Sequence, residues 1–267
     1  MKRIVFVLVA AIGLMVPAVA PSAVEAEVLR VGISSDNPPW SFVPERLPLL
    51  LSATTQLPAV TPAQFKTLTG LDADVASALA QQMGAGLRLV PANWQTLEKD
   101  LLAKQFDLLL SSWTPSRKTP PGVAVSEPYY TWGLVLCVRA DEGNVKSFQS
   151  LATAKVLGYY KDPAVEQTLQ SLGGVETKTY DNEGTMFRDL KAGKIDVLVH
   201  DSTYVRWRVN QDASLKIVGD PLNKLGYHVG VRKDEPELFA RVQAAVRALV
   251  ASPEMARIKA KWEAFGK

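Results

Sequence analysis

Two successive α/β patterns constrain the fold of this 267-residue chain more than any other feature. In the first pattern, strands and helices are predicted to alternate over 28–33, 71–83, 87–90, 94–104 and 106–110. Its last strand, Phe106–Leu110, is a continuous apolar run, which is typical of a strand buried in a parallel sheet. The order β-α-β-α-β therefore predicts a doubly wound α/β unit.

The alternation begins again at Leu134 and predicts a second α/β unit. Strands are predicted at 134–138, 155–159 and 195–199, and a last strand follows at 227–231. A helix is predicted to open at Asp162-Pro163, and others cover 185–192, 202–210, 235–250 and the residues after Ser252. Two such units predict a two-lobed molecule with a cleft between the lobes.

The N-terminus has the features of a secretory signal peptide. Lys2 and Arg3 precede an uncharged apolar stretch at 4–16, which is too short to span a bilayer comfortably. Small residues follow, and we predict cleavage before Glu27, so that residues 1–26 are removed. No cysteine lies near this position, so the sequence predicts a free, soluble protein in an exported compartment.

Composition argues against several classes of function. The net charge is only +3 and no dense Lys/Arg run follows the signal peptide, so no nucleic-acid partner is indicated. Cys137, the only cysteine, lies in an apolar strand, where a buried structural thiol is expected. His200 and His228 do not have metal-ligand spacing, and we expect neither a metal nor a cofactor.

Hydroxyl residues and an arginine follow the strand that ends near Ser112. Ser111, Ser112 and Thr114 offer O–H donors, and Arg117 offers a planar fork suited to a carboxylate. Ligands of open α/β sheets bind beyond the carboxyl ends of strands, so this segment is a candidate anion site. An ordinary exit from a strand into a loop is the alternative.

The segment 44–69 fits neither α/β unit. It has prolines at 44, 48, 58 and 62 and an apolar patch at Leu47–Leu51. Such proline density disfavours a long helix or a central strand. The segment is interpreted as a surface excursion, as a lid over the cleft, or as a docking patch for another periplasmic protein.

Several stretches, taken in order, resemble the family 3 solute-binding proteins, which serve ABC importers of polar amino acids. They are Leu29–Ile33 with Pro38–Phe42, then Leu68–Val75, Phe106–Ser112, Ser126–Tyr130 and Gly193–Asp201. The resemblance implies a periplasmic-binding-protein-like clamshell of two doubly wound lobes joined by a two-crossing hinge. Lobe 1 would comprise 27–131 and 228–267, and lobe 2 would comprise 132–227, with crossings near 130–133 and 225–227.

The resemblance also implies a function and a set of ligand contacts. A periplasmic binding protein without enzymatic activity would capture an amino acid or related small amine and deliver it to a membrane permease. Trp40 and Trp94 would form apolar walls, and Asp201 would hold the α-ammonium group. The α-carboxylate would contact Ser111, Ser112, Thr114 and Arg117, although the spacing around Arg117 departs from the family and leaves Lys118 as an alternative.

The sharpest departure from the family is Lys161-Asp162-Pro163, where a glycine and a hydroxyl residue are usual. Asp162 can fill the N–H groups that the family offers to the ligand carboxylate. Either Arg117 then holds the carboxylate with little help, or the ligand is more cationic and faces Trp40, Trp94 and Tyr159. An accessory protein that docks on a periplasmic partner, and an enzyme resembling cyclohexadienyl dehydratases with Asp162 as acid, are the alternatives.

Overall fold

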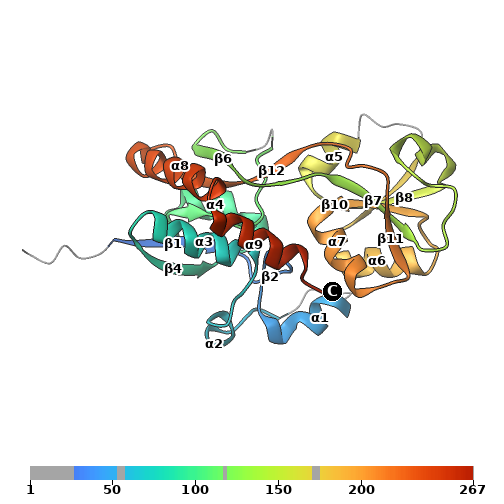
Figure 1. Cartoon of the computed structure of the whole chain (residues 1–267), viewed down its shortest axis with the longest axis horizontal. Coiled ribbons are helices and arrows are strands. Elements are labelled where there is room, and N and C mark those ends of the chain that lie inside the picture. Colours follow the sequence, from blue (N-terminus) through green and yellow to red (C-terminus); the bar gives the residue numbers. More distant parts are fainter. Residues whose placement is uncertain (1–26, 53–57, 117–118, 170–174, 267) are drawn as a thin grey trace, which may run out of the picture.

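A computed structural model describes residues 27–52, 58–116, 119–169 and 175–266. Two α/β lobes lie next to one another, each with helices packed against its own sheet (Figure 1). The predicted signal peptide, Arg117 and Lys118 lie outside the described residues. Within those described ranges, no helix has both the length and the apolar character needed to cross a membrane.

The first lobe contains a five-stranded mixed sheet. In spatial order its strands are β4 (Gly86–Pro91), β1 (Val28–Ile33), β5 (Leu108–Leu109), β12 (Leu225–Arg232) and β6 (Val123–Trp132). The first three are parallel, whereas β12 is antiparallel to both of its neighbours. The helices of this lobe are α3 (Leu71–Gln82), α4 (Leu97–Leu102), α8 (Pro236–Val250) and α9 (Pro253–Glu263).

The second lobe contains another five-stranded mixed sheet. In spatial order its strands are β11 (Leu215–Val218), β7 (Leu134–Arg139), β10 (Val197–Asp201), β8 (Val156–Tyr160) and β9 (Glu176–Tyr180). The strands β10, β8 and β9 are parallel, so their carboxyl ends meet at one edge of the sheet. Its helices are α5 (Pro163–Leu169), α6 (Glu183–Lys191) and α7 (Ser202–Gln211), with a 3₁₀ segment at Phe148–Thr153.

The chain passes between the two sheets twice. The first passage is at Gly133, between β6 and β7, and the second lies between Val218 and Leu225. A side chain at Gly133 would overlap the carbonyl oxygen of Asn223, so the two passages lie in close contact. Because β12 is paired with β6 from Leu225 onward, the second passage lies just ahead of the crossing predicted near 225–227. The limits proposed for the lobes remain a prediction.

Two predicted elements are shorter in the structure. The predicted helix at 94–104 is a 3₁₀ turn at Trp94–Thr96 followed by α4, and the predicted strand at 106–110 keeps only Leu108–Leu109 in β5. Cys137 is buried as predicted, and burial raises the pKa of its thiol to about 12, so the thiol stays protonated at neutral pH.

The described residues of the segment 44–69 include three short helical elements and no long helix, in agreement with the proline density. They are a 3₁₀ turn at Pro44–Arg46, α1 (Leu47–Ser52) and α2 (Pro62–Phe65). Pro44, Pro48 and Pro62 all lie in first turns, where the missing N–H is not needed. Just before the segment, a small hairpin pairs β2 (Asp36–Asn37) with β3 (Ser41–Phe42).

Candidate functional site

A cavity of about 830 Å³ lies between the two lobes. Residues near the carboxyl ends of β1, β4 and β5 line it from the first lobe, and residues that follow β8, β9 and β10 line it from the second. Ligands of open α/β sheets bind at such edges, and the volume falls in the range of small-molecule sites. This cavity is therefore the candidate binding site.

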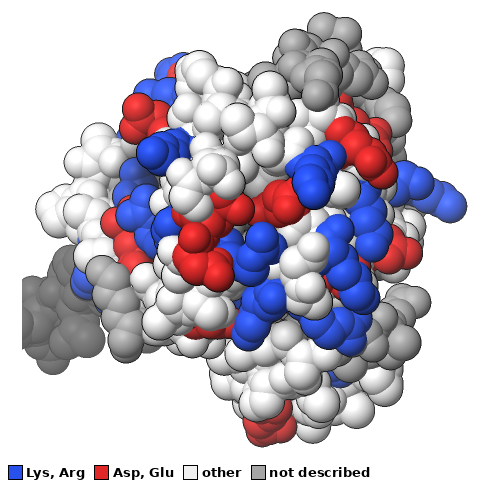
Figure 2. All heavy atoms as spheres, turned by 90° about the vertical axis from the view of Figure 1, so that its right-hand side faces the viewer, with Lys and Arg blue, Asp and Glu red and all other residues white. Residues whose placement is uncertain are grey.

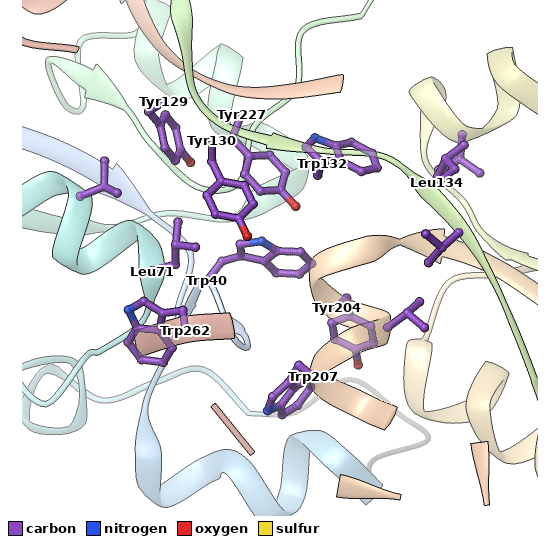
Figure 3. Packing of buried hydrophobic residues seen from close by; sticks show 14 of the residues in the cluster. Trp40, Leu71, Tyr129, Tyr130, Trp132, Leu134, Tyr204, Trp207, Tyr227 and Trp262 are labelled. Carbon is purple, nitrogen blue, oxygen red and sulfur yellow. The ribbon is translucent and has the colours of Figure 1, made fainter. Parts of the chain in front are cut away.

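Aromatic side chains from both lobes meet beside the cavity. Trp40, which is only 4% exposed, stacks on Tyr204 of α7 at a ring-centroid distance of 5.7 Å and meets the edge of Tyr227 at 6.0 Å. Tyr227 in turn stacks on Trp132 at 5.6 Å. Figure 3 shows Trp40 between these rings. Contact of Trp40 with Tyr204 joins the first lobe to the second, so the cavity walls depend on both lobes.

Asp201 ends β10, caps α7 and lines the cavity. Its Oδ1 accepts hydrogen bonds from the backbone N–H of Thr203 at 2.6 Å and of Tyr204 at 3.4 Å. The hydroxyl of Tyr227 donates to its other carboxylate oxygen. Burial raises the pKa of Asp201 to about 6, while these hydrogen bonds favour the ionised form. Asp201 therefore both caps α7 and lines the cavity.

A second buried carboxylate, Asp72, supports the loop that follows β5. It accepts hydrogen bonds from the backbone N–H of Ser112 and from the Tyr129 hydroxyl, both at 2.6 Å. Burial raises its pKa to about 7, and the nearby Asp201 charge acts in the same direction. Ser112 has a φ of 47°, so this contact accompanies an unusual backbone conformation. Sequence reasoning placed Asp72 at a helix start but missed this contact.

The predicted hydroxyl residues of the first lobe have different environments. Ser111 is buried and accepts a hydrogen bond from the backbone N–H of Ser34, and it is not among the residues that line the cavity. Ser112 and Thr114 do line it. Thr114 donates to the carbonyl of Gly226 at 2.9 Å and accepts from the indole N–H of Trp132 at 3.1 Å, so it helps to fix the strands near the passages between lobes.

Three further predicted residues can be located. Trp94 is half-buried and lines the cavity, as does Asp162, whose Oδ1 accepts the backbone N–H of Val165 at 3.1 Å at the start of α5. Tyr160, rather than the predicted Tyr159, lines the cavity. Successive side chains of a strand point to opposite faces, which separates these neighbours on β8.

The cavity wall is rich in negative charge. Its lining includes Asp36, Asp162, Asp181, Glu183 and Asp201, and no lysine or arginine is found among the described residues of the lining. By contrast, the outer end of the second lobe carries many Lys and Arg side chains (Figure 2). Sequence reasoning missed Asp181 and Glu183, because the strand before them was not recognised.

Two of the lining carboxylates have basic neighbours. Asp36 forms an ion pair with buried Arg46 at 3.2 Å, and Glu183 lies 3.5 Å from the imidazole Nε2 of His200. Together with Asp201, the acidic residues after β8 and β9 occupy one edge of three neighbouring parallel strands. This edge can attract and hold a positively charged group.

Comparison with known proteins agrees with this architecture. The L-cystine-binding protein TcyJ of Escherichia coli is 25% identical over 243 residues, which cover 89% of this chain and 83% of the relative. The L-arginine-binding protein of Pseudomonas aeruginosa is 26% identical over 256 residues, covering 92% and 91%.

Solved structures with the same fold include an ancestral arginine-binding protein bound to arginine. It is 25% identical, with a TM-score of 0.69, and the match covers 88% of this chain and 97% of that one. Holo ArgBP from T. maritima is 26% identical, with a TM-score of 0.65 and coverage of 88% and 96%. The model of the bacterial extracellular solute-binding proteins, family 3, matches residues 53–267. The chain belongs to that family.

Proposed function

We propose that this protein binds a cationic amino acid, or a related small amine, between its lobes and delivers it to the membrane permease of an ABC importer. The observation that carries the proposal is the acidic cavity, whose described lining holds five carboxylates and neither lysine nor arginine. Family membership supports capture and transport, and relatives named for arginine support a cationic ligand.

In this proposal Asp201 accepts the α-ammonium group, while Trp40 and Trp94 contact the ligand through their rings. Arg117 holds the α-carboxylate, with Lys118 as the alternative partner. Alanine substitution at each position distinguishes Arg117 from Lys118 as the partner of the carboxylate. Loss of affinity in Arg117→Ala with a silent Lys118→Ala supports the arginine, and the reverse result assigns the carboxylate to the lysine.

The proposed location is the periplasm, reached through removal of residues 1–26. We propose binding without catalysis, because the cap of α5 accounts for Asp162 without an acid–base role. A ligand that contacts both lobes favours the closed arrangement, as expected for a two-lobed protein with a hinge.

The test is a thermal-shift and calorimetric screen of the mature wild-type protein. We expect arginine, lysine or ornithine to bind, and glutamate and leucine to bind weakly. A ligand at about 100 times its dissociation constant should add roughly 2.7 kcal/mol to the free energy of unfolding. Tight binding of glutamate or aspartate, with no response to the cations, would contradict the proposal.

A further inference from the structure

The segment between Phe42 and Thr69 is held at both of its ends. The backbone N–H of Phe42 donates to the carbonyl of Thr69 at 2.8 Å, and the reverse bond measures 3.0 Å. Arg46, near the start of the segment, is buried against Asp36, which lines the cavity. The segment therefore leaves the first lobe at a fixed place beside the binding site.

From this anchor the segment extends to the second lobe. Helix α1 contacts α6, and Figure 1 shows α1 beneath the space between the two lobes. Glu183, the first residue of α6, lines the cavity. The contact between α1 and α6 thus places a piece of the first lobe beside the acidic edge of the second.

Neighbouring leucines of α1 have different surroundings. Leu50 lines the cavity, whereas Leu49 is 55% exposed. Ala59 and Val60, where the chain returns towards α2, also line the cavity. Leu50, Ala59 and Val60, called the apolar surface below, therefore face a cavity whose lining also holds five carboxylates.

We infer that this apolar surface selects the ligand by the aliphatic stem that carries its positive charge. Carboxylates of the second lobe hold the charge, while Leu50 contacts the methylene groups and limits the length of the stem. A few polar groups that fix orientation beside apolar walls are the usual arrangement of small-molecule sites. This inference rests on the proposed function and adds the feature by which the site discriminates among cations.

Cysteine labelling tests the position of the wall. Leu50→Cys and Leu49→Cys are compared, because native Cys137 is buried and its raised pKa keeps it unreactive. We expect the thiol at position 50 to react several times more slowly than that at position 49, and saturating arginine to slow only the former. Equal rates at the two positions without ligand would overturn the inference.

Binding of a graded series tests selection. Ornithine, lysine, arginine and homoarginine are titrated into the wild type, Leu50→Ala and the matched control Leu49→Ala. In Leu50→Ala we expect preference to move towards homoarginine by roughly tenfold, since the shortened side chain leaves room for one or two methylene groups. Leu49→Ala should keep the wild-type order.

The outcomes separate this inference from the proposed function. If the wild type binds none of the cations, the proposed function fails. Unequal labelling at positions 49 and 50 without ligand would still support the position of Leu50 in the cavity wall. If Leu50→Ala weakens every cation by the same factor, α1 only supports closure and the selection role is refuted. Circular dichroism of both alanine variants verifies that they fold.

Discussion

Replacing Asp201 by asparagine should strengthen the fold and weaken ligand binding in the same variant. Burial raises the pKa of this carboxyl from 3.8 to about 6. Its ionised form therefore costs about 3 kcal/mol of folding free energy, at about 1.36 kcal/mol per pKa unit. Asparagine retains an oxygen that can accept the N–H groups of α7, so the cap survives while the buried charge is removed.

The gain in stability should depend on pH with a definite sign. Between about pH 4 and 6 the unfolded carboxyl has released its proton and the folded one still holds it. The unfolded state then binds fewer protons, so wild-type stability falls as pH rises through this window. Urea unfolding without ligand should show no gain from Asp201→Asn below about pH 4 and the full gain above about pH 6.

Binding should change in the opposite direction. Removing one member of a buried charge pair typically costs about 2–5 kcal/mol, so affinity for the cation should fall roughly 30-fold or more. Asp212→Asn is the matched control, because Asp212 lies away from the cavity and pairs with Lys191. Its pKa is about 2, below the ordinary value despite the opposing effect of burial, so its loss should reduce stability and leave binding intact. A less stable Asp201→Asn variant with unchanged affinity would refute the reasoning.

Three other substitutions test separate parts of the structure. Burial raises the pKa of Asp72 to about 7, so wild-type stability should fall between about pH 4 and 7, and Asp72→Asn should flatten this fall. If the free energy of unfolding, measured with urea, falls equally with pH in both proteins, this prediction is contradicted. Gly133→Ala should cost about 2 kcal/mol through overlap with the Asn223 carbonyl, whereas Gly143→Ala, which has open space, should be nearly neutral in the same assay. Asp162→Thr keeps a capping residue, so stability should change by under about 1 kcal/mol, while calorimetry should show higher affinity for glutamate; unchanged affinity would argue against the role of the cap in ligand choice.

Apolar periodicity predicted the elements that bury a continuous face. Helix α3 was expected over 71–83 and spans Leu71–Gln82, because its apolar stripe and the following Gly84 define it locally. The strand β9 was missed, because Glu176–Tyr180 is mostly polar and exposed. Missing β9 also concealed Asp181 and Glu183, which reach the cavity only because that strand ends beside β8.

Site residues could be predicted from the sequence where a local pattern determines the position of the residue in the fold. Asp201 follows a buried strand, and its place at the sheet edge follows from that order alone. Asp72 and Tyr227 could not be assigned in this way, since their contacts with Ser112 and Asp201 join residues far apart in the chain. Tyr159 was predicted where Tyr160 lines the cavity, because the sequence does not reveal which face of the strand β8 meets the cleft.

Two backbone hydrogen bonds between Phe42 and Thr69 join the ends of the intervening segment, so this segment is suited to replacement as one unit. None of the described residues between them belongs to either five-stranded sheet, so the stretch can be replaced while both sheets keep their strands, provided that the buried pair of Arg46 and Asp36 is retained. Each doubling of loop length costs only about 0.6 kcal/mol of closure entropy. Under the inference drawn for Leu50, exchanging this one stretch would change which ligands bind, while the surfaces of both lobes keep their sequence.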